Sequence, residues 1–142
     1  MSDAFRHRIR VRYSECDLQG VVFNANYLTY LDEAVTELLR RSVDGAYQGM
    51  VAEGADMVVA EANVRYLSPA RFDDVLDVEL EVSRLGTTSM VTSYRVHRGE
   101  ETLAEAELRH VFVHAGEGGK RPVPAAVRAG LEAHMAARAP TG

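Results

Sequence analysis

The sequence predicts an α+β domain in which a sheet wraps over one long helix. Residues 25–43 contain no Gly or Pro and carry apolar side chains at helical spacing, which predicts the helix. Segments with the alternation or composition of β-strands lie on both sides of it, one before and four after. At 142 residues the chain is most simply a single domain, residues 1–142.

The first predicted strand spans residues 5–13, where two kinds of side chain alternate. One face holds Phe5, His7, Ile9, Val11 and Tyr13, and the other holds Arg6, Arg8, Arg10 and Arg12. This pattern favours a half-buried strand whose arginines face solvent, with contact to a phosphate or an acidic carrier protein as the alternative. Residues 14–23 follow as a loop that turns at Gly20.

The predicted helix opens near Asn24, a residue type that suits the N-cap position. Arg40 and Arg41 lie in its last turn, where positive charge is favourable. The apolar stripe is wide, which predicts a helix buried against a sheet rather than one lying on a surface. It consists of Tyr27, Leu28, Leu31, Ala34, Val35, Leu38 and Leu39.

Four further strands are predicted after the helix, at residues 57–67, 75–85, 88–98 and 101–114. The last three are joined by short connections at Gly86 and Gly99-Glu100, so we expect them to form an antiparallel meander. The Ala- and Arg-rich stretch at about residues 124–142 predicts a peripheral helix or tail.

Composition limits the possible function classes. The net charge of −5 argues against a general nucleic-acid binder. No stretch approaches the roughly 18–20 apolar residues that cross a bilayer, and the first ten residues lack the apolar region of a secretory signal. Cys16 is the single cysteine and cannot form an internal disulfide. We therefore expect a cytoplasmic protein with no membrane association.

A motif within residues 13–27 carries the strongest indication of function. It comprises Tyr13, Asp17, the run Gly20-Val21-Val22-Phe23 and the pair Asn26-Tyr27. Weaker matches are Arg65-Tyr66, Pro69-Ala70-Arg71 and Pro122-Val123-Pro124. Together with the order of elements, these residues resemble the hotdog-fold thioesterases, specifically the 4-hydroxybenzoyl-CoA thioesterase-like acyl-CoA thioesterases. The resemblance covers a core of about residues 5–125.

The resemblance implies a hotdog fold, in which a five-stranded antiparallel sheet wraps around a central helix. It also implies homodimers that often assemble into tetramers, and active sites at the subunit interface. It implies that Asp17 carries the hydrolysis and that the backbone N–H near the helix start, at Asn24, polarises the thioester carbonyl. No metal or cofactor is expected, since coenzyme A is part of the substrate. The expected substrate-binding residues are Gly20, Val22, Phe23, Tyr27, Val58, Val59 and Arg65.

The position of Asp17 also fits this chemistry on physical grounds. A carboxylate near a helix N-terminus lies close to free backbone N–H groups, which bind developing negative charge. Asp17 could attack the carbonyl carbon or deprotonate a water, and the sequence leaves both routes open. The alternative is a turn residue that bonds its own backbone, which aspartate does well.

Other acids lie close to this motif. Glu15 could raise the pKa of a neighbouring acid by like-charge repulsion, but we expect it to be a solvated loop residue. A second class of hotdog thioesterases uses a helix acid as its catalyst, and Asp32, Glu33 and Glu37 lie inside the predicted helix. Glu37 is expected to pair with Arg41 instead, as an ordinary surface pair.

Metal and thiol chemistry receive little support. His110 and His114 lie on one face of a predicted strand, but no partner at ligand spacing accompanies them. The acid beside Cys16 would raise the pKa of its thiol and make it a poor nucleophile.

The expected binding residues also have structural interpretations. Tyr27 could line an acyl pocket or fill the core, and Val58 and Val59 could form a pocket wall or a buried strand. The phosphates of coenzyme A require Arg or Lys side chains, although each candidate is favoured as a solvated surface residue. The candidates are Arg65, Arg71, Arg84, Arg95, Arg98, Lys120 and Arg121.

The sequence therefore predicts an enzyme, an acyl-CoA thioesterase. Two alternatives stay open: a hydrolase of acyl groups on an acyl carrier protein, and a non-catalytic hotdog protein that binds an acyl ligand.

Overall fold

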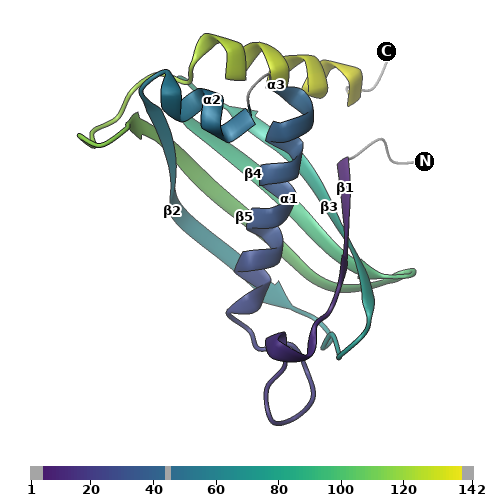
Figure 1. Cartoon of the computed structure of the whole chain (residues 1–142). Coiled ribbons are helices and arrows are strands. Elements are labelled where there is room, and N and C mark those ends of the chain that lie inside the picture. Colours follow the sequence, from purple (N-terminus) through teal and green to yellow (C-terminus); the bar gives the residue numbers. More distant parts are fainter. Residues whose placement is uncertain (1–4, 44–45, 139–142) are drawn as a thin grey trace.

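The computed structural model describes residues 5–43 and 46–138, and it shows a five-stranded antiparallel sheet with a long helix across one face (Figure 1). The strands are β1 (Phe5–Arg10), β2 (Ala55–Tyr66), β3 (Val75–Leu85), β4 (Ser89–Arg98) and β5 (Glu101–His114). The helices are α1 (Asn26–Ser42), α2 (Ala46–Ala52) and α3 (Ala125–Arg138). The predicted α+β architecture is therefore confirmed.

The strands lie in the order β1-β3-β4-β5-β2, and each neighbouring pair is antiparallel. The expected meander is confirmed, because β3, β4 and β5 follow one another in both the sequence and the sheet. β1 and β2 precede and follow the helical segment in sequence, and they occupy opposite edges of the sheet. β2 therefore pairs with β5 on one side and has no strand on its other side within the described part of the chain.

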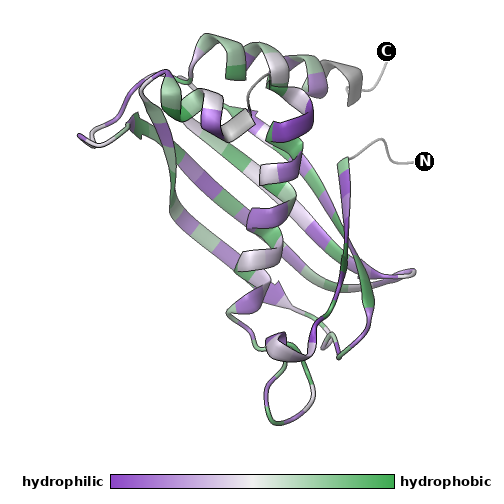
Figure 2. Cartoon of the chain, viewed as in Figure 1, coloured by the Kyte–Doolittle hydropathy of each residue, from purple (hydrophilic) through white to green (hydrophobic). Residues whose placement is uncertain are grey.

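The core lies between α1 and the sheet. From the helix, Tyr30, Leu31 and Leu38 are at most 1% exposed. The sheet contributes alternate residues such as Leu76 and Leu80, both fully buried. Figure 2 shows this alternation as a change between hydrophobic and hydrophilic residues along the strands. The two periodicities read from the sequence thus meet in one core.

The first strand is shorter than predicted. β1 ends at Arg10, and the chain then bonds the β2–β3 connection through Val11, whose N–H donates to the carbonyl of Asp74 (2.9 Å). A short 3-10 helix, Tyr13–Glu15, follows. The prediction that Tyr13 continues the buried face is wrong, since this turn leaves its side chain 80% exposed.

Both shorter helices lie near the C-terminal end of α1 (Figure 1). The sequence pattern did not predict α2. The helix expected after residue 124 is present as α3, and its Val127 and Leu131 are buried in the core. Gly130 lies so close to the carbonyl of Ser42, at the end of α1, that a Cβ atom there would overlap the oxygen. A residue without a side chain is what lets α3 cross α1 at this point.

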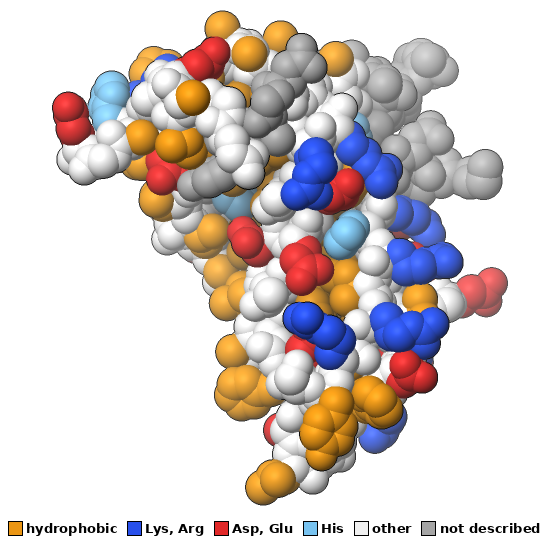
Figure 3. Space-filling model, viewed as in Figure 1, with side chains coloured by type: hydrophobic (Ala, Val, Ile, Leu, Met, Phe, Trp, Pro, Cys, Tyr) orange, Lys and Arg blue, Asp and Glu red, His pale blue; other side chains and the backbone are white. Residues whose placement is uncertain are grey.

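The arginines of β1 form the predicted charged face, and Figure 3 shows the basic side chains along this strand. Each pairs with an acid: Arg6 with Glu79 (2.9 Å), Arg8 with Asp77 (3.0 Å) and Arg10 with Asp73 (3.1 Å). Since these guanidinium groups already have carboxylate partners, the row is a surface of the scaffold.

Candidate active site

The motif segment forms a loop that projects beyond the start of α1 (Figure 1). At its base Cys16 and Val22 form an antiparallel bridge, and the N–H of Asp17 donates to the carbonyl of Val21 (2.9 Å). Gly20 has φ 77°, a left-handed conformation that glycine adopts without strain, and its N–H donates to the carbonyl of Asp17 (3.0 Å). The turn predicted at Gly20 is therefore confirmed, and it places Asp17 at the start of the projecting loop.

The carboxylate of Asp17 is exposed and turned by a local hydrogen bond. One oxygen, Oδ1, accepts the backbone N–H of Gln19 (2.8 Å). Aspartate is well suited to this turn, and Asp17 does bond its own backbone, which is compatible with a catalytic role of its other oxygen. The bond leaves Oδ2 without a hydrogen-bond partner in residues 5–43 and 46–138. The turn thus orients the carboxylate and leaves an oxygen available to react.

Asp17 lines an open cavity of about 620 Å³. The other lining residues are Tyr13, Cys16, Leu18, Gly20 and Phe72. Tyr13 and Phe72 meet edge to face, with ring centroids 5.9 Å apart. Figure 3 shows hydrophobic side chains gathered at this end of the molecule. An apolar wall beside a carboxylate suits a substrate that is apolar next to its reacting carbonyl.

The start of α1 differs from the prediction. The helix begins at Asn26 with Ala25 in the N-cap position, and no side chain caps it, so the prediction of Asn24 as N-cap is wrong. The carbonyls of Asn24 and Ala25 accept from the helix, at 3.2 Å from the N–H groups of Tyr27 and Leu28. Their own N–H groups have no acceptor among the described residues. Two free donors therefore precede the helix, where they can bind negative charge.

Asn24 lines a second cavity, of about 230 Å³. The other residues around it are Val21, Val22, Tyr27, Tyr66, Leu67, Ser68 and Pro69. Gly20 lines the first cavity and Val21 the second, so the two openings adjoin along the chain. In the single chain, Asp17 and Asn24 therefore line neighbouring cavities rather than one.

Tyr27 and Tyr66 form the aromatic side of the second cavity, with ring centroids 5.3 Å apart. Tyr27 is 2% exposed, and its hydroxyl accepts the N–H of Ala70 (3.3 Å). The Tyr66 hydroxyl donates to the carbonyl of Asn24 (3.1 Å). Tyr27 thus belongs both to the core and to the cavity, and the two interpretations of it are compatible.

Glu15 is the largest departure from the sequence analysis. It was expected to be solvated, but it is 7% exposed, so that prediction is wrong. Its carboxylate accepts from the N–H and guanidinium of Arg12 and from the hydroxyl of Tyr30. Burial opposes ionisation of this group, but these hydrogen bonds and the positive charge outweigh it and lower the pKa of Glu15. Glu15 is therefore held as a buried carboxylate beside the site.

Cys16 is half-buried, and burial together with the charges of Asp17 and Glu15 raises the pKa of its thiol. The predicted rise in the pKa of this thiol agrees with its surroundings, and a raised pKa disfavours the reactive thiolate.

The other expected binding residues lie elsewhere. Phe23 is 54% exposed and lines neither cavity. Val58 and Val59 are 46% and 52% exposed on edge strand β2, so the prediction that they form a buried strand is wrong. Because β2 has no neighbour beyond it in the described chain, these valines lack the cover that a central strand would receive.

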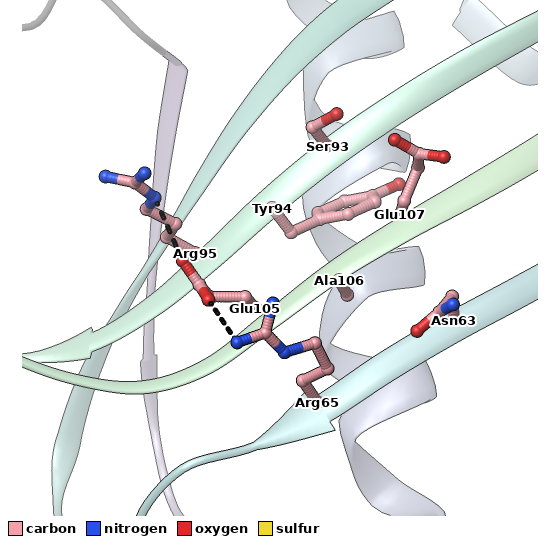
Figure 4. Close-up of a pocket in the computed structure, with 8 residues that line it drawn as sticks. All are labelled: Asn63, Arg65, Ser93, Tyr94, Arg95, Glu105, Ala106 and Glu107. Carbon is pink, nitrogen blue, oxygen red and sulfur yellow. Dashed lines mark ion pairs between the residues drawn. The ribbon is translucent and has the colours of Figure 1, made fainter.

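Arg65 lies on the face of the sheet opposite α1. In Figure 4 its side chain is in front of the strands, and the helix lies behind them. Its guanidinium is 3.6 Å from Glu105, which also lies 3.6 Å from Arg95. These residues line a cavity of about 370 Å³ on that face. The structure does not bring Arg65 to Asp17.

The acids of helix α1 also make their contacts with residues outside the Asp17 loop. Glu37 pairs with Arg40 and, as predicted, with Arg41 (3.4 Å). Glu33 is 3.7 Å from His7 of β1. Asp32 lines a separate cavity of about 260 Å³ between α1 and the segment that follows it.

Three residues of the site were missed: Tyr30, Tyr66 and Phe72. Tyr30 carried a usable signal, because a tyrosine on the buried stripe of a helix needs a partner for its hydroxyl. Tyr66 belonged to the Arg65-Tyr66 match, but nothing in that match indicated a place beside Tyr27. Phe72 carried no signal, since it reaches the site through the packing of the β2–β3 connection against the loop.

Within the described residues, no helix is long and apolar enough to cross a membrane. Among the same residues, no three His, Cys, Asp or Glu side chains are grouped so that they could hold a metal ion.

Comparison with known proteins gives a consistent result. A model of the thioesterase superfamily matches residues 19–105. The chain is 36% identical over 124 residues to the acyl-CoA thioester hydrolase YbgC of Escherichia coli O6:H1, covering 87% of this chain and 92% of that protein. It is 28% identical to the 1,4-dihydroxy-2-naphthoyl-CoA hydrolase of Nostoc punctiforme, covering 85% and 82%.

A solved structure with the same fold is a hypothetical protein from Aquifex aeolicus, with a TM-score of 0.84 and 32% identity. The alignment covers 89% of this chain and 98% of that one.

Proposed function

Because the chain belongs to the thioesterase superfamily, with the hotdog fold, we propose that it hydrolyses acyl-CoA thioesters to the free acid and coenzyme A. The observation that carries the proposal is the carboxylate of Asp17, which lines an open apolar cavity and has one oxygen without a partner in the described chain. Relatives named for CoA-ester hydrolysis, YbgC among them, support the substrate class.

In the proposed reaction, Asp17 acts as the general base or as the nucleophile that begins hydrolysis. It either deprotonates a water that adds to the thioester carbon, or it adds to that carbon itself and gives a mixed anhydride that water then cleaves. In both routes the C–S bond breaks and coenzyme A leaves as its thiolate, which takes up a proton. The net reaction consumes one water.

The negative charge that develops on the carbonyl oxygen needs donors. We assign this role to the backbone N–H of Asn24, with that of Ala25 beside it at the uncapped start of α1. A general base contributes roughly 10²–10⁴-fold and one such donor about 10²–10³-fold. Together they lower the barrier by about 5–10 kcal/mol, at roughly 1.4 kcal/mol per decade.

The acyl group is proposed to pass over Val22 and Tyr27, with Gly20 allowing close approach of the backbone. Four of the expected binding residues lie outside both cavities: Phe23, Val58, Val59 and Arg65. They are proposed to bind substrate only in an assembled oligomer. A second copy of the chain would have to bring them to the substrate.

A homo-oligomer is part of the proposal, and edge strand β2 supports it. Its outer edge is unpaired in the described chain, and Val58, Val59 and Tyr66 are each about half exposed. Such an edge favours pairing with another strand, and two copies of β2 can pair antiparallel about a two-fold axis. Light scattering after size exclusion should give about twice or four times 15.6 kDa. A mass of one chain would contradict it.

The substrate class is tested with a panel of CoA thioesters from short aliphatic to aryl, read by release of free thiol. Hydrolysis of at least one member, with kcat/KM in the enzymatic range above about 10⁴ M⁻¹s⁻¹, is the expected result. The same acyl group on an acyl carrier protein provides the comparison. Hydrolysis of the carrier-bound ester alone would replace the CoA proposal, and hydrolysis of neither would leave a non-catalytic acyl-binding protein.

A further inference from the structure

The buried carboxylate of Glu15 has no role in the proposed chemistry, yet it lies two residues before Asp17. We propose that Glu15 is a positioning residue, which fixes the Asp17 loop and the free N–H groups before α1 relative to one another. The inference rests on the proposed function. It concerns how the two halves of the site are held, not what they do.

The side chain of Glu15 links the start of the loop to α1 through hydrogen bonds. Its Oε1 accepts from the N–H of Arg12 (2.8 Å) and from the hydroxyl of Tyr30 (2.9 Å). Its Oε2 accepts from Nε (3.0 Å) and Nη2 (2.9 Å) of Arg12. Tyr30 is fully buried in the core, so this hydrogen bond ties the loop to a helix residue that is packed on all sides.

The backbone carbonyl of Glu15 forms hydrogen bonds with the end of the same loop. It accepts from the N–H of Phe23 (2.9 Å) and from Nδ2 of Asn26 (2.9 Å). Phe23 immediately precedes Asn24, whose N–H is the proposed oxyanion donor, and Asn26 is the first residue of α1. One residue therefore bonds both the segment that leads into Asp17 and the segment that carries the donors.

A direct role in proton transfer does not fit this geometry. Each carboxylate oxygen of Glu15 already accepts two hydrogen bonds, and Glu15 lines neither of the two cavities. The donors that surround it also keep the carboxylate ionised. A group that is saturated by internal donors can hold a loop, but it is not available to a substrate.

The charged form is needed for this role. In Glu15→Gln an NH₂ group would replace one oxygen and face either the two guanidinium donors of Arg12 or the Arg12 N–H beside the Tyr30 hydroxyl. At least one hydrogen bond from Arg12 and the charge of the ion pair would be lost, while the backbone bonds of residue 15 stay possible. The loop should shift rather than unfold, and a shift of about 1 Å in a reacting group costs on the order of 10²-fold in rate.

The experiment measures kcat, KM and the pH profile of the full-length chain on its best CoA ester. Glu15→Gln should lower kcat by roughly 10–10²-fold, change KM by less than about threefold, and leave the acidic limb of the pH profile in place. Tyr30→Phe, which removes only the buried hydrogen bond, should show the same pattern more weakly and serves if Glu15→Gln does not fold. Glu79→Gln is the matched control, because Glu79 also pairs with an arginine but lies on the sheet.

Two kinetic results would overturn the inference. Unchanged kcat in folded Glu15→Gln and Tyr30→Phe would show that the network only stabilises the fold. Loss of the acidic limb in Glu15→Gln would make Glu15 a proton carrier instead.

Amide hydrogen exchange separates this inference from the proposed function. Exchange at residues 16–26 should rise by at least about tenfold in Glu15→Gln, while amides of β3–β5 stay unchanged. This readout needs no activity, so an inactive wild-type chain would refute the hydrolase proposal and still test the positioning role. Unaltered exchange at residues 16–26 would refute the positioning role.

Discussion

The sheet with α1 and the segment from Tyr13 to Asn26 are ordered by different interactions. In the sheet and helix, regular alternation buries residues such as Leu31 and Leu76 to 1% exposure or less. In the segment, Tyr13 and Leu18 are almost fully exposed, and order comes from hydrogen bonds centred on Glu15. Mutations should therefore separate the two: changes to the core alter stability, and changes to the loop alter turnover.

The largest effect is expected from Asp17→Asn, which removes the reacting oxygen but keeps an Oδ1 that can accept from Gln19. Thioester hydrolysis should fall by about 10²–10⁴-fold. The free energy of unfolding should change by less than about 0.5 kcal/mol, as at other exposed positions. Steady-state kinetics and urea titration measure both.

Asp77→Asn is the matched control for Asp17→Asn, because Asp77 pairs with Arg8 on the sheet and should leave turnover unchanged. Turnover near wild type in folded Asp17→Asn would contradict the assignment of Asp17.

Leu31→Ala should have the opposite signature. The side chain is 1% exposed in the core, so truncation leaves a cavity and should cost about 2–5 kcal/mol of unfolding free energy. The kcat of the folded fraction should stay within about twofold of wild type. Leu28→Ala, at a residue 43% exposed on the same helix, should cost less. If kcat fell even when all of the Leu31→Ala protein is folded, core mutations would alter turnover as well as stability, and the expected separation would be wrong.

The core should also respond to pH through His110. This residue is 1% exposed, its Nε2 lies 3.0 Å from Oγ1 of Thr92, and its Nδ1 has no partner among the described residues. Burial lowers the pKa of His110 to about 4, whereas an unfolded histidine has a pKa of about 6.5. The unfolded chain therefore binds more protons between these values, and stability should fall as pH drops from about 6.5 to about 4.

The loss attributable to His110 is about 3 kcal/mol, from the roughly 1.4 kcal/mol that each pKa unit represents. Unfolding free energies measured across this range should decline less steeply in His110→Gln. His114→Gln, at an exposed position, should decline as wild type does. Equal slopes in His110→Gln and wild type would contradict the prediction.

The smallest expected effect is at Gly130. Alanine normally stabilises a helix interior by up to about 1 kcal/mol, but here its Cβ would overlap the Ser42 carbonyl, which is backbone and cannot swing aside. Gly130→Ala should therefore destabilise the fold by about 1–3 kcal/mol, measured by thermal or urea unfolding, with normal kcat. Ala129→Gly, at an exposed neighbour, measures helix propensity alone. A more stable Gly130→Ala would show that α3 does not pack as described.

The sheet with α1 and the segment from Tyr13 to Asn26 also differ in how much of their structure could be predicted from the sequence. Strands β3 and β5 have the bounds expected from their alternation and their glycine connections, because such patterns are local. The seven-residue α2 is too short for a period to establish, and it was missed. The half-exposed valines of β2 were misjudged because periodicity indicates a strand but not its place at an edge of the sheet.

In the site, the motif located Asp17, the turn at Gly20 and the helix start to within two residues. The burial of Glu15 could not be predicted, since it depends on the hydroxyl of Tyr30, 15 residues later in the sequence. The N-cap was misplaced for a related reason: the side chain of Asn26, not Asn24, bonds the loop, through the carbonyl of Glu15.

The most direct measurement is a crystal structure of the wild-type protein with an unreactive ketone analogue, in which CH₂ replaces the sulfur of a good CoA substrate. If Asp17 and the donors before α1 act as proposed, the ketone oxygen should lie within about 2.7–3.2 Å of the N–H of Asn24 or Ala25. The carboxylate of Asp17 should lie about 3–3.5 Å from the ketone carbon, or one water away. A ketone bound with its oxygen away from the start of α1, or beyond the reach of Asp17, would contradict both assignments.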